Sequence, residues 1–205
     1  GRSFVNYTMR PGDYSNLSHN RVLSIDEDAS GYLWVTTYDM HLYRFDVYEE
    51  VFISVSDVLK DLPIGNSKAN EVFCDSAGRV WVALSGAGLV CFNEDMSFRT
   101  FMNSSVSNIG SDVTGLYEDS AGNIYAASEV GLAMISGDSV SLLARNVDVV
   151  SFSERKGSLL FACRDQLLSV DMATREQRKV DFVGLGVGEA VTMTLTGPEE
   201  TLFVG

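Results

Sequence analysis

The chain has 205 residues, of which 45% are hydrophobic, and 28 acidic against 15 basic residues give it a formal net charge of −13. Nucleic acids and anionic membrane surfaces are therefore disfavoured as partners, because both are bound by clustered Lys and Arg. The sequence contains no run of about 18 apolar residues that would predict a membrane-spanning helix. The length is sufficient for one substantial hydrophobic core.

The first part of the chain contains four short β-rich runs, at residues 22–25, 32–36, 42–45 and 51–55. Clusters of Gly, Asp, Asn and Ser separate these runs. Short apolar runs between turn-forming residues predict a four-stranded antiparallel meander.

The same four runs recur along the rest of the chain, and a fifth period contains only two of them. The later runs are 71–74, 80–84, 89–92 and 97–101; 113–117, 124–127, 132–135 and 140–143; 149–152, 159–163, 167–170 and 178–182; and 191–195 and 201–204. We therefore predict an all-β chain. Its repeats span roughly 17–55, 66–102, 108–144, 147–183 and, incompletely, 187–205.

In the second period the fourth run alternates apolar Phe98 and Phe101 with polar neighbours, which predicts an outer strand half in water. The first two runs are more continuously apolar, which predicts inner strands buried on both faces.

A short sequence motif marks each period: a turn, usually Asp-x-x-Gly, followed by a strand with a central aromatic residue. The aromatic residues are spaced by 47, 44, 36 and 42 residues, at Trp34, Trp81, Tyr125, Phe161 and Phe203. A period near 40–45 residues with strand-like units is typical of a β-propeller. At one blade a period the chain holds about four and a half blades, so we expect a piece of a larger ring, because an open arc would expose unpaired edges.

The Asp-x-x-Gly motif has a structural explanation. Asp at the first position of a type I turn accepts hydrogen bonds from the backbone two residues on, and Gly at the fourth takes the positive φ that closes the hairpin. One carboxylate in each turn is far below the ligand set of a calcium ion. The aromatic residue that follows is expected to pack against the neighbouring blade.

The remaining reactive residues predict no cofactor and no metal site. Cys74, Cys91 and Cys163 lie in or beside predicted strands without C-x-x-C spacing, which indicates buried free thiols. His19 and His41 have no third ligand at a supporting spacing, so they are interpreted as solvated loop residues.

Three of the periods resemble the two-component regulator propeller repeat. The first carries Leu17-Ser-His-Asn-Arg-Val22, Ile25-Asp-Glu-Asp28, Gly31-Tyr-Leu-Trp-Val35 and Leu42-Tyr-Arg-Phe-Asp46. The second and third match at the positions listed here: Asn70-Glu-Val72, Asp75, Gly78, Val80-Trp-Val82 and Gly88-Leu-Val-Cys-Phe92; Val113, Glu118-Asp119, Gly122, Ile124-Tyr125 and Gly131-Leu132. The fourth and fifth depart from the pattern, with Ser153 for the turn Asp, an extra residue before Gly157, Gln166 for Gly, and Glu200 for Gly.

This resemblance implies an extracytoplasmic sensor region of a hybrid two-component system histidine kinase, placed in the periplasm as part of an inner-membrane protein. It implies recognition of an oligosaccharide or similar nutrient and relay of that signal to a kinase, with a homodimer formed through the parent protein. By itself this segment is expected to be non-catalytic and to contact no membrane directly.

In a propeller, the loop leading into the first strand and the loop between the second and third strands share one rim. The candidate ligand-binding residues are the polar and aromatic residues of those loops: Asn20, Arg21, Tyr38, Asp39, His41, Lys68, Asn70, Asp112 and Arg164. Tyr38 is expected to stack on a sugar face, and Arg21 or Arg164 to pair with a uronate or sulfate.

Two alternatives remain open. The propeller is either a scaffold whose rim binds a partner domain without a small ligand, or a glycan-cleaving enzyme. For the second, the candidate acid–base residues are Asp39, Asp112, Glu129 and Asp165. Fold analogy alone does not separate the three functions.

Overall fold

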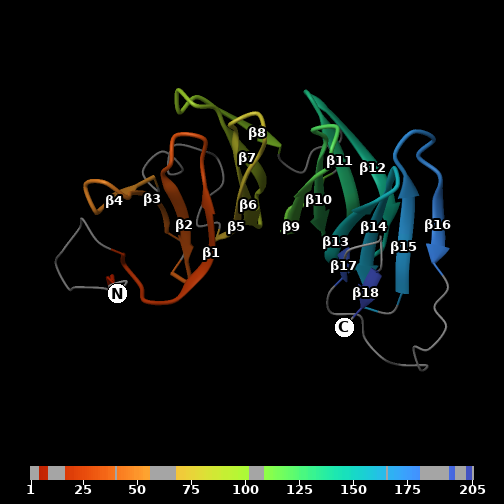
Figure 1. The fold of residues 1–205 in the computed structure, drawn as a ribbon, viewed down its shortest axis with the longest axis horizontal. Coiled ribbons are helices and arrows are strands. Elements are labelled where there is room, and N and C mark those ends of the chain that lie inside the picture. Colours follow the sequence, from red (N-terminus) through yellow and green to blue (C-terminus); the bar gives the residue numbers. More distant parts are fainter. Residues whose placement is uncertain are drawn as a thin grey trace. The chain divides into compact units, whose positions relative to one another are not determined.

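The computed structural model describes residues 5–8, 17–39, 41–55, 68–101, 109–164, 166–180, 194–196 and 202–204, with only the backbone of Lys68 and of the last two ranges. The chain divides into two compact units, residues 1–101 and 102–205. Every helix or strand element within the described ranges is a β-strand, as the sequence predicts (Figure 1).

The first unit contains two four-stranded antiparallel meanders, in which each strand pairs with the next along the chain. Blade 1 consists of β1 (Val22–Glu27), β2 (Leu33–Thr37), β3 (Leu42–Asp46) and β4 (Val51–Ser54). Blade 2 consists of β5 (Lys68–Cys74), β6 (Val80–Ser85), β7 (Gly88–Phe92) and β8 (Phe98–Phe101).

The second unit contains two more meanders of the same order and one strand pair. Blade 3 consists of β9 (Val113–Glu118), β10 (Ile124–Ser128), β11 (Gly131–Ser136) and β12 (Ser139–Arg145). Blade 4 consists of β13 (Val149–Arg155), β14 (Ser158–Cys163), β15 (Gln166–Asp171) and β16 (Gln177–Val180). The pair is β17 (Thr194–Thr196) with β18 (Leu202–Val204). Residues 181–182, 191–193 and 201 of the predicted runs lie outside the described residues.

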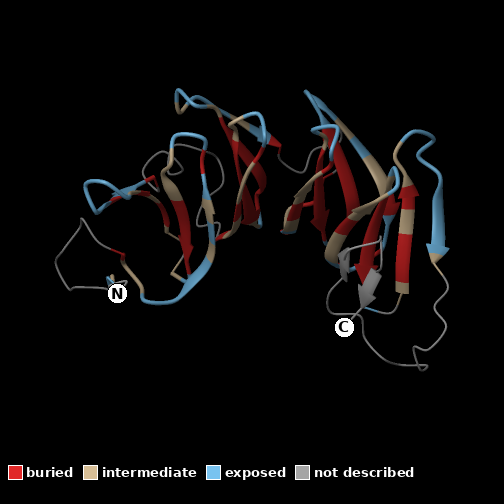
Figure 2. Ribbon diagram, in the orientation of Figure 1, coloured by how far each residue is buried: buried red, intermediate tan, exposed pale blue. Residues whose placement is uncertain are grey.

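Burial falls mainly on the second and third strands of each blade (Figure 2). All five residues of β7 are buried, whereas β8 is mostly exposed, as predicted for an outer strand. The prediction of burial for the first two strands of blade 2 is confirmed for β6, in which five of six residues are buried, but is wrong for β5, in which only Ala69 and Val72 are buried among the described side chains. The first strands of the other blades are also largely uncovered, since β1 has no buried residue and β9 and β13 have two each. Each first strand is an edge of its sheet, so it is covered less completely than the strands paired on both sides.

The turn aspartates close the hairpin between the first and second strands, as the sequence predicts. In blade 2, Asp75 Oδ1 accepts the N–H of Ala77 at 3.0 Å and of Arg79 at 2.8 Å. The N–H of Gly78 bonds the Asp75 carbonyl, and Gly78 has φ of 78°. The same bonds recur at Asp28 and Asp119, so the turn is built from one carboxylate and one glycine in all three blades.

The second oxygen of each turn aspartate binds the aromatic residue six positions later in the chain. This contact was not predicted from the sequence. Trp34 Nε1, Trp81 Nε1 and Tyr125 Oη donate to Oδ2 of their own aspartates at 2.8, 2.7 and 2.8 Å. All three aromatic side chains are essentially fully buried. The buried polar atom of each ring is therefore satisfied within its own hairpin, and the turn is tied to the blade core.

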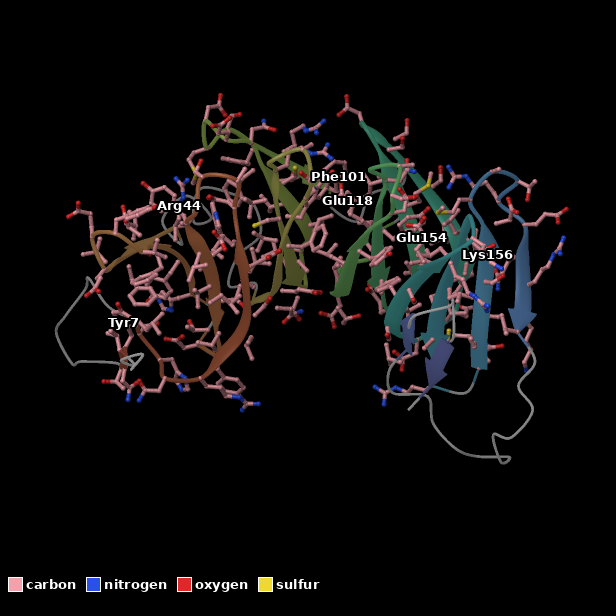
Figure 3. The ribbon with its side chains drawn as sticks, viewed as in Figure 1. Tyr7, Arg44, Phe101, Glu118, Glu154 and Lys156 are labelled. Carbon is pink, nitrogen blue, oxygen red and sulfur yellow. The ribbon has the colours of Figure 1, made fainter. Side chains whose placement is uncertain are left out.

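A third side-chain donor also reaches each aspartate: it lies four positions after the aspartate in blades 2 and 3, but on β3 in blade 1. Arg44 on β3 donates to Asp28, Arg79 in the turn donates to Asp75, and the Asn123 side chain donates to Asp119. Arg44, labelled in Figure 3, also lies 3.7 Å from the centroid of the Tyr32 ring. Each of the three carboxylates thus accepts hydrogen bonds from several protein donors. This supports a structural role for the Asp-x-x-Gly motif.

Blade 4 closes its first hairpin in another way. Arg155 pairs with Ser158, so only Lys156 and Gly157 form the turn, with φ of 47° and 73°. Positive φ at both central residues is typical of a type I′ hairpin. Glu154 (Figure 3) instead accepts the N–H of Ser120 in the blade 3 turn at 2.7 Å, which links the two hairpins of this unit.

The two blades of the first unit meet through β1 and β5. Ser24 Oγ lies 3.3 Å from both the N and the O of Val72, and Asp26 accepts the N–H of Cys74 at 2.7 Å. Trp34 and Phe92 pack with ring centroids 5.6 Å apart, as predicted for aromatic packing between neighbouring blades. Polar side chains of β1 therefore satisfy the free backbone edge of β5, which would otherwise be left unpaired.

The three cysteines are free, and Cys91 and Cys163 are buried as predicted, whereas Cys74 is half-buried. Burial raises the pKa of the Cys91 thiol to about 11. Burial, with nearby Asp26, raises the pKa of the Cys74 thiol to about 12. Both thiols are therefore protonated at neutral pH and behave as small apolar side chains.

Asp75→Ala is expected to destabilise the chain by about 3 kcal/mol or more, because it leaves the buried indole N–H of Trp81 unpaired and removes the carboxylate that pairs with Arg79. Urea unfolding measures the change. The matched control is Asp95→Ala in the β7–β8 turn, whose exposed carboxylate bonds only Ser97, so this change should alter the stability far less. Equal losses for the two variants would contradict the proposed role of Asp75.

Stability should fall in acid as Asp119 is protonated. Burial alone raises the pKa of Asp119, but hydrogen bonds from Asn123 and Tyr125 outweigh it and hold the pKa below its ordinary value. Its stabilising contribution is complete above the unfolded pKa of about 3.9 and is lost as pH falls through the lower folded value. Thermal unfolding between pH 7 and 2 should show a shallower acid loss for Asp119→Asn, with Tyr125→Phe intermediate; an unchanged acid limb would refute this.

Candidate functional site

The predicted shared rim is present in blade 1. The loop before β1 and the loop between β2 and β3 lie side by side, because the N–H of Tyr38 bonds the carbonyl of Arg21 at 2.9 Å. The loop before β1 is also held by Tyr43, whose hydroxyl accepts the N–H of Ser18 at 3.0 Å. We call residues 17–21 together with 37–39 and 41 the blade 1 rim. It brings together five of the predicted residues: Asn20, Arg21, Tyr38, Asp39 and His41.

Arg21, Tyr38 and His19 form one cluster on the blade 1 rim. The Arg21 guanidinium carbon lies 4.4 Å from the centroid of the Tyr38 ring, a cation–π distance. The His19 and Tyr38 ring centroids are 5.7 Å apart, and the Tyr38 side chain is 46% exposed. An aromatic ring with a cation beside it, half open to solvent, can hold a flat polar ligand.

Asp39 and His41 form a second group on the same rim. Asp39 accepts a hydrogen bond from Thr37 Oγ1 at 2.7 Å and lies 3.3 Å from Nδ1 of His41. Burial raises the pKa of Asp39, but hydrogen bonds from Ser18 and Thr37 outweigh it, so the pKa lies below its ordinary value. Asp39 is therefore a carboxylate held in its loop by the hydrogen bond from Thr37.

The equivalent loops of blade 3 are held together by Glu129. Its Oε1 accepts the N–H and the hydroxyl of Ser111 at 2.7 and 2.9 Å, and its Oε2 accepts the N–H of Asp112 at 2.9 Å. Gly110, with φ of 88°, permits this close approach, since a Cβ there would lie 2.6 Å from Ser128 Oγ. The bonds from Ser111 and Asp112 outweigh the effect of burial and lower the pKa of Glu129.

A hollow of about 520 Å³ opens beside these loops in the second unit. Its wall consists of side chains from blade 3 and from the segment between β12 and β13: Asp112, Thr114, Ser128, Glu129, Asn146, Val147 and Asp148. Asp112 therefore lines this hollow. Arg164 forms an exposed ion pair with Asp148, so its charge is already compensated, and Asp165 lies outside the described residues.

A bulge in every first strand places one further residue near the loop end of each blade. The register with the second strand skips one residue, at Leu23 in blade 1, Asn70 in blade 2, Thr114 in blade 3 and Val150 in blade 4. Bulges re-aim side chains and are frequent next to functional sites. Asn70 was predicted from the sequence as a ligand residue, whereas the other three were not, since their residue types carry no chemical signal.

The remaining predicted residue is Lys68, whose backbone begins β5 but whose side chain lies outside the description. Asn66 and Ser67 of the predicted blade 2 loop and Asn108 of the blade 3 loop also lie outside the described residues. The structure therefore defines the blade 1 rim completely except for Met40, and it defines the other rims in part.

A smaller hollow of about 260 Å³ lies at the opposite end of blades 1 and 2. Its lining includes the two Asp-x-x-Gly turns and the β7–β8 turn with Asn93 and Glu94. Sequence reasoning assigned these turns to structure alone, and the hydrogen bonds of Asp28 and Asp75 agree with that assignment.

The described side chains do not assemble a metal centre, because no group of three His, Cys, Asp or Glu residues among them is arranged to hold an ion. Of the four candidate acid–base residues, Asp39 and Glu129 are engaged by hydrogen bonds, and Asp165 is not described. No helix suited to crossing a bilayer occurs in the described ranges.

Comparison with known proteins agrees with the sequence resemblance. Residues 16–39 match the family model of the two component regulator propeller, which covers β1, β2 and most of the blade 1 rim. No curated protein sequence matches the chain significantly.

Solved structures share the fold at low sequence identity. One is the extracellular domain of a protein described as the hybrid two component system BT3049 from B. thetaiotaomicron, with a TM-score of 0.77 and 20% identity over 99% of this chain and 28% of that chain. A second is the extracellular domain of BT4673 from the same organism, with a TM-score of 0.56 and 19% identity over 96% and 34% of the two chains.

A third is PorZ, a surface component of the type-IX secretion system of Porphyromonas gingivalis, with a TM-score of 0.69 and 14% identity over 100% and 33%. The chain thus spans about a third or less of the length of these structures. The family match and the four-stranded blades confirm the predicted all-β propeller segment, and residues 16–39 confirm the resemblance to the two-component regulator propeller.

Glu129→Ala is expected to loosen the loop before β9 without unfolding blade 3. Removing the carboxylate leaves the N–H groups of Ser111 and Asp112 without their acceptor, so both amides should exchange with solvent about tenfold faster or more. Hydrogen exchange followed by NMR measures this. Glu176→Ala, which removes an exposed partner of Arg178, is the control, and equal protection of Ser111 in wild type and Glu129→Ala would contradict the role of Glu129.

Proposed function

We propose that this chain is a ligand-sensing propeller segment of the extracytoplasmic region of a hybrid two-component signalling protein. In this proposal it recognises an oligosaccharide or similar nutrient on its blade rim, does not cleave it, and passes the signal to a kinase in the parent protein. The protein belongs in the periplasm, with its signalling parts across the inner membrane.

The observation that carries the proposal is where the family repeat lies in the structure. Residues 16–39 match the two component regulator propeller, and the same residues supply Asn20, Arg21, Tyr38 and Asp39 of the blade 1 rim. Two of the solved structures with the same fold are described as extracellular domains of hybrid two component systems. The family repeat and the candidate binding residues of the blade 1 rim therefore occupy the same segment of the chain, which supports the proposal.

The chemistry of the rim favours binding over cleavage. Tyr38 offers a half-exposed aromatic ring, and Arg21 and His19 offer hydrogen-bond donors beside it. Sugars combine apolar C–H faces with hydroxyl groups, so they are matched by an aromatic ring flanked by polar groups. The carboxylate described on this rim, Asp39, accepts a hydrogen bond from Thr37, and a glycosidase would need two carboxyl groups about 5–10 Å apart on either side of the bond.

A second function is favoured by one observation. The innermost strand of blade 1 exposes three apolar side chains, with 43% of Val22, 41% of Leu23 and 58% of Ile25 accessible. A partner domain that covers β1 would bury them. In that case the propeller is a scaffold, and signalling passes through a protein contact.

Calorimetry on the complete sensor region of the parent protein, against a broad oligosaccharide panel, tests the proposal. We expect at least one oligosaccharide to bind and to be recovered uncleaved. Tyr38→Ala should weaken that binding about tenfold, because the stacking surface is lost, whereas Tyr48→Ala at the opposite end of blade 1 should not.

Other outcomes decide between the alternatives. Failure of every oligosaccharide to bind, together with a stable protein contact that buries β1, would replace the sensor proposal by the scaffold. Release of shorter sugars from the bound oligosaccharide would establish an enzyme.

A further inference from the structure

We propose that the Arg21 corner of the blade 1 rim, formed by His19, Arg21 and Tyr38, binds the negatively charged group of an acidic sugar, a carboxylate or a sulfate. This inference rests on the proposed function and specifies its ligand class. The argument uses the pairing of Arg21, the tautomer of His19 and the surroundings of Asp39.

Arg21 differs from the arginines of the same fold whose charges are compensated. Arg44, Arg79 and Arg164 pair with Asp28, Asp75 and Asp148. Arg21 is exposed and pairs with no carboxylate among the described residues; its guanidinium instead lies over the Tyr38 ring. The cation–π contact holds the guanidinium at the ring, and its N–H donors have the fork geometry that matches a carboxylate or a sulfate.

His19 adds a second donor beside the Tyr38 ring. Its Nδ1 accepts the backbone N–H of Arg21 at 2.9 Å, so in the neutral imidazole the proton lies on Nε2. The His19 ring is 5.7 Å from the Tyr38 ring, and no described residue bonds Nε2. The corner therefore presents hydrogen-bond donors from two side chains, which favours a ligand group that only accepts hydrogen bonds. An ionised acid is such a group, whereas a sugar hydroxyl both donates and accepts.

The nearest carboxylate in the sequence does not compete for this position. Asp39 follows Tyr38, but its Oδ1 accepts a hydrogen bond from Thr37 Oγ1 at 2.7 Å, and its Oδ2 lies 3.3 Å from His41 Nδ1 without a hydrogen bond. The corner is thus a local cationic point on a chain of net charge −13. An anionic ligand is repelled by most of this surface at long range, so a specific cation is required where it binds.

Apolar surface for the remainder of the sugar lies next to the corner. The Tyr38 ring is half exposed, and Val22 and Leu23, which follow Arg21 directly, are 43% and 41% exposed. The C–H face of a pyranose can contact these groups while its acidic substituent reaches the guanidinium. The arrangement accounts for why exposed apolar residues and an exposed cation occur together at the start of β1.

The test uses the complete sensor region and an array of oligosaccharides in matched sets, in which each backbone is present in neutral, uronate-containing and sulfated forms. We expect the acidic form of at least one backbone to bind more tightly than its neutral form. The uronate and sulfate arms show which acid is recognised. Affinity should fall as salt is raised, because the contact is ionic.

Arg21→Gln should raise the Kd of the acidic probe about tenfold or more and the Kd of the neutral form by a clearly smaller factor, because the neutral form makes no ionic contact with Arg21. Arg21→Lys, which keeps the charge but not the planar fork, should lie between. Arg178→Gln, which removes an exposed charge in blade 4, is the control and should have no effect. Unchanged thermal unfolding of Arg21→Gln would separate loss of binding from loss of folding.

Three results would overturn this inference, and they separate it from the proposed function. Binding of neutral oligosaccharides with no preference for acidic forms refutes the acidic-sugar site and leaves the sensor proposal intact. Preference for an acidic form that persists in Arg21→Gln places the contact elsewhere. Binding of no oligosaccharide in the array refutes both.

Discussion

The fold depends on one buried carboxylate in each of the first three hairpins, because this group ties the turn, the second strand and the blade core together. Asp75 accepts two backbone N–H groups with one oxygen and the Trp81 indole with the other. A buried indole N–H needs an acceptor, and a buried carboxylate needs several donors, so each group makes the burial of the other tolerable. The large aromatic side chain can then fill the blade interior, and the loops at the far end of the same strands gain a rigid support.

Much of this fold could be predicted from the sequence because its signals are local. The alternation of apolar runs and turn residues located the strands of blades 1 to 4 to within three residues at each described end, and Asp-x-x-Gly gave the turn geometry. The bond from Trp81 to Asp75 was missed although its spacing repeats, since an aromatic residue in a strand is normally explained by packing alone. The exposure of β1 was missed because an apolar sequence does not show that a strand lies at a sheet edge.

The candidate site was predictable only as a set of loops. Rim sharing follows from topology, so Arg21 and Tyr38 could be placed in neighbouring loops. That the guanidinium lies on the Tyr38 ring depends on side-chain geometry, which no spacing encodes. The bulge at Thr114 is invisible in the sequence, because it appears only when two strands are set in register. In the sequence Arg164 is equivalent to Arg21. Its partner, Asp148, lies 16 positions earlier in the chain, and no spacing rule predicts that pairing.

The Asp–aromatic closure has a consequence for how such chains change over evolutionary time. Its atoms all come from within seven consecutive positions, as between Asp75 and Trp81, so duplicating one period of the gene also duplicates the bonds that hold the new hairpin shut. Blade number can therefore grow without fresh adjustment of the interior. The Glu154 bond to Ser120 is different, because it joins neighbouring periods and works only in that order. A copy of blade 4 at another position would lose the Glu154–Ser120 bond, whereas a copy of blade 2 would keep the Asp75–Trp81 bond.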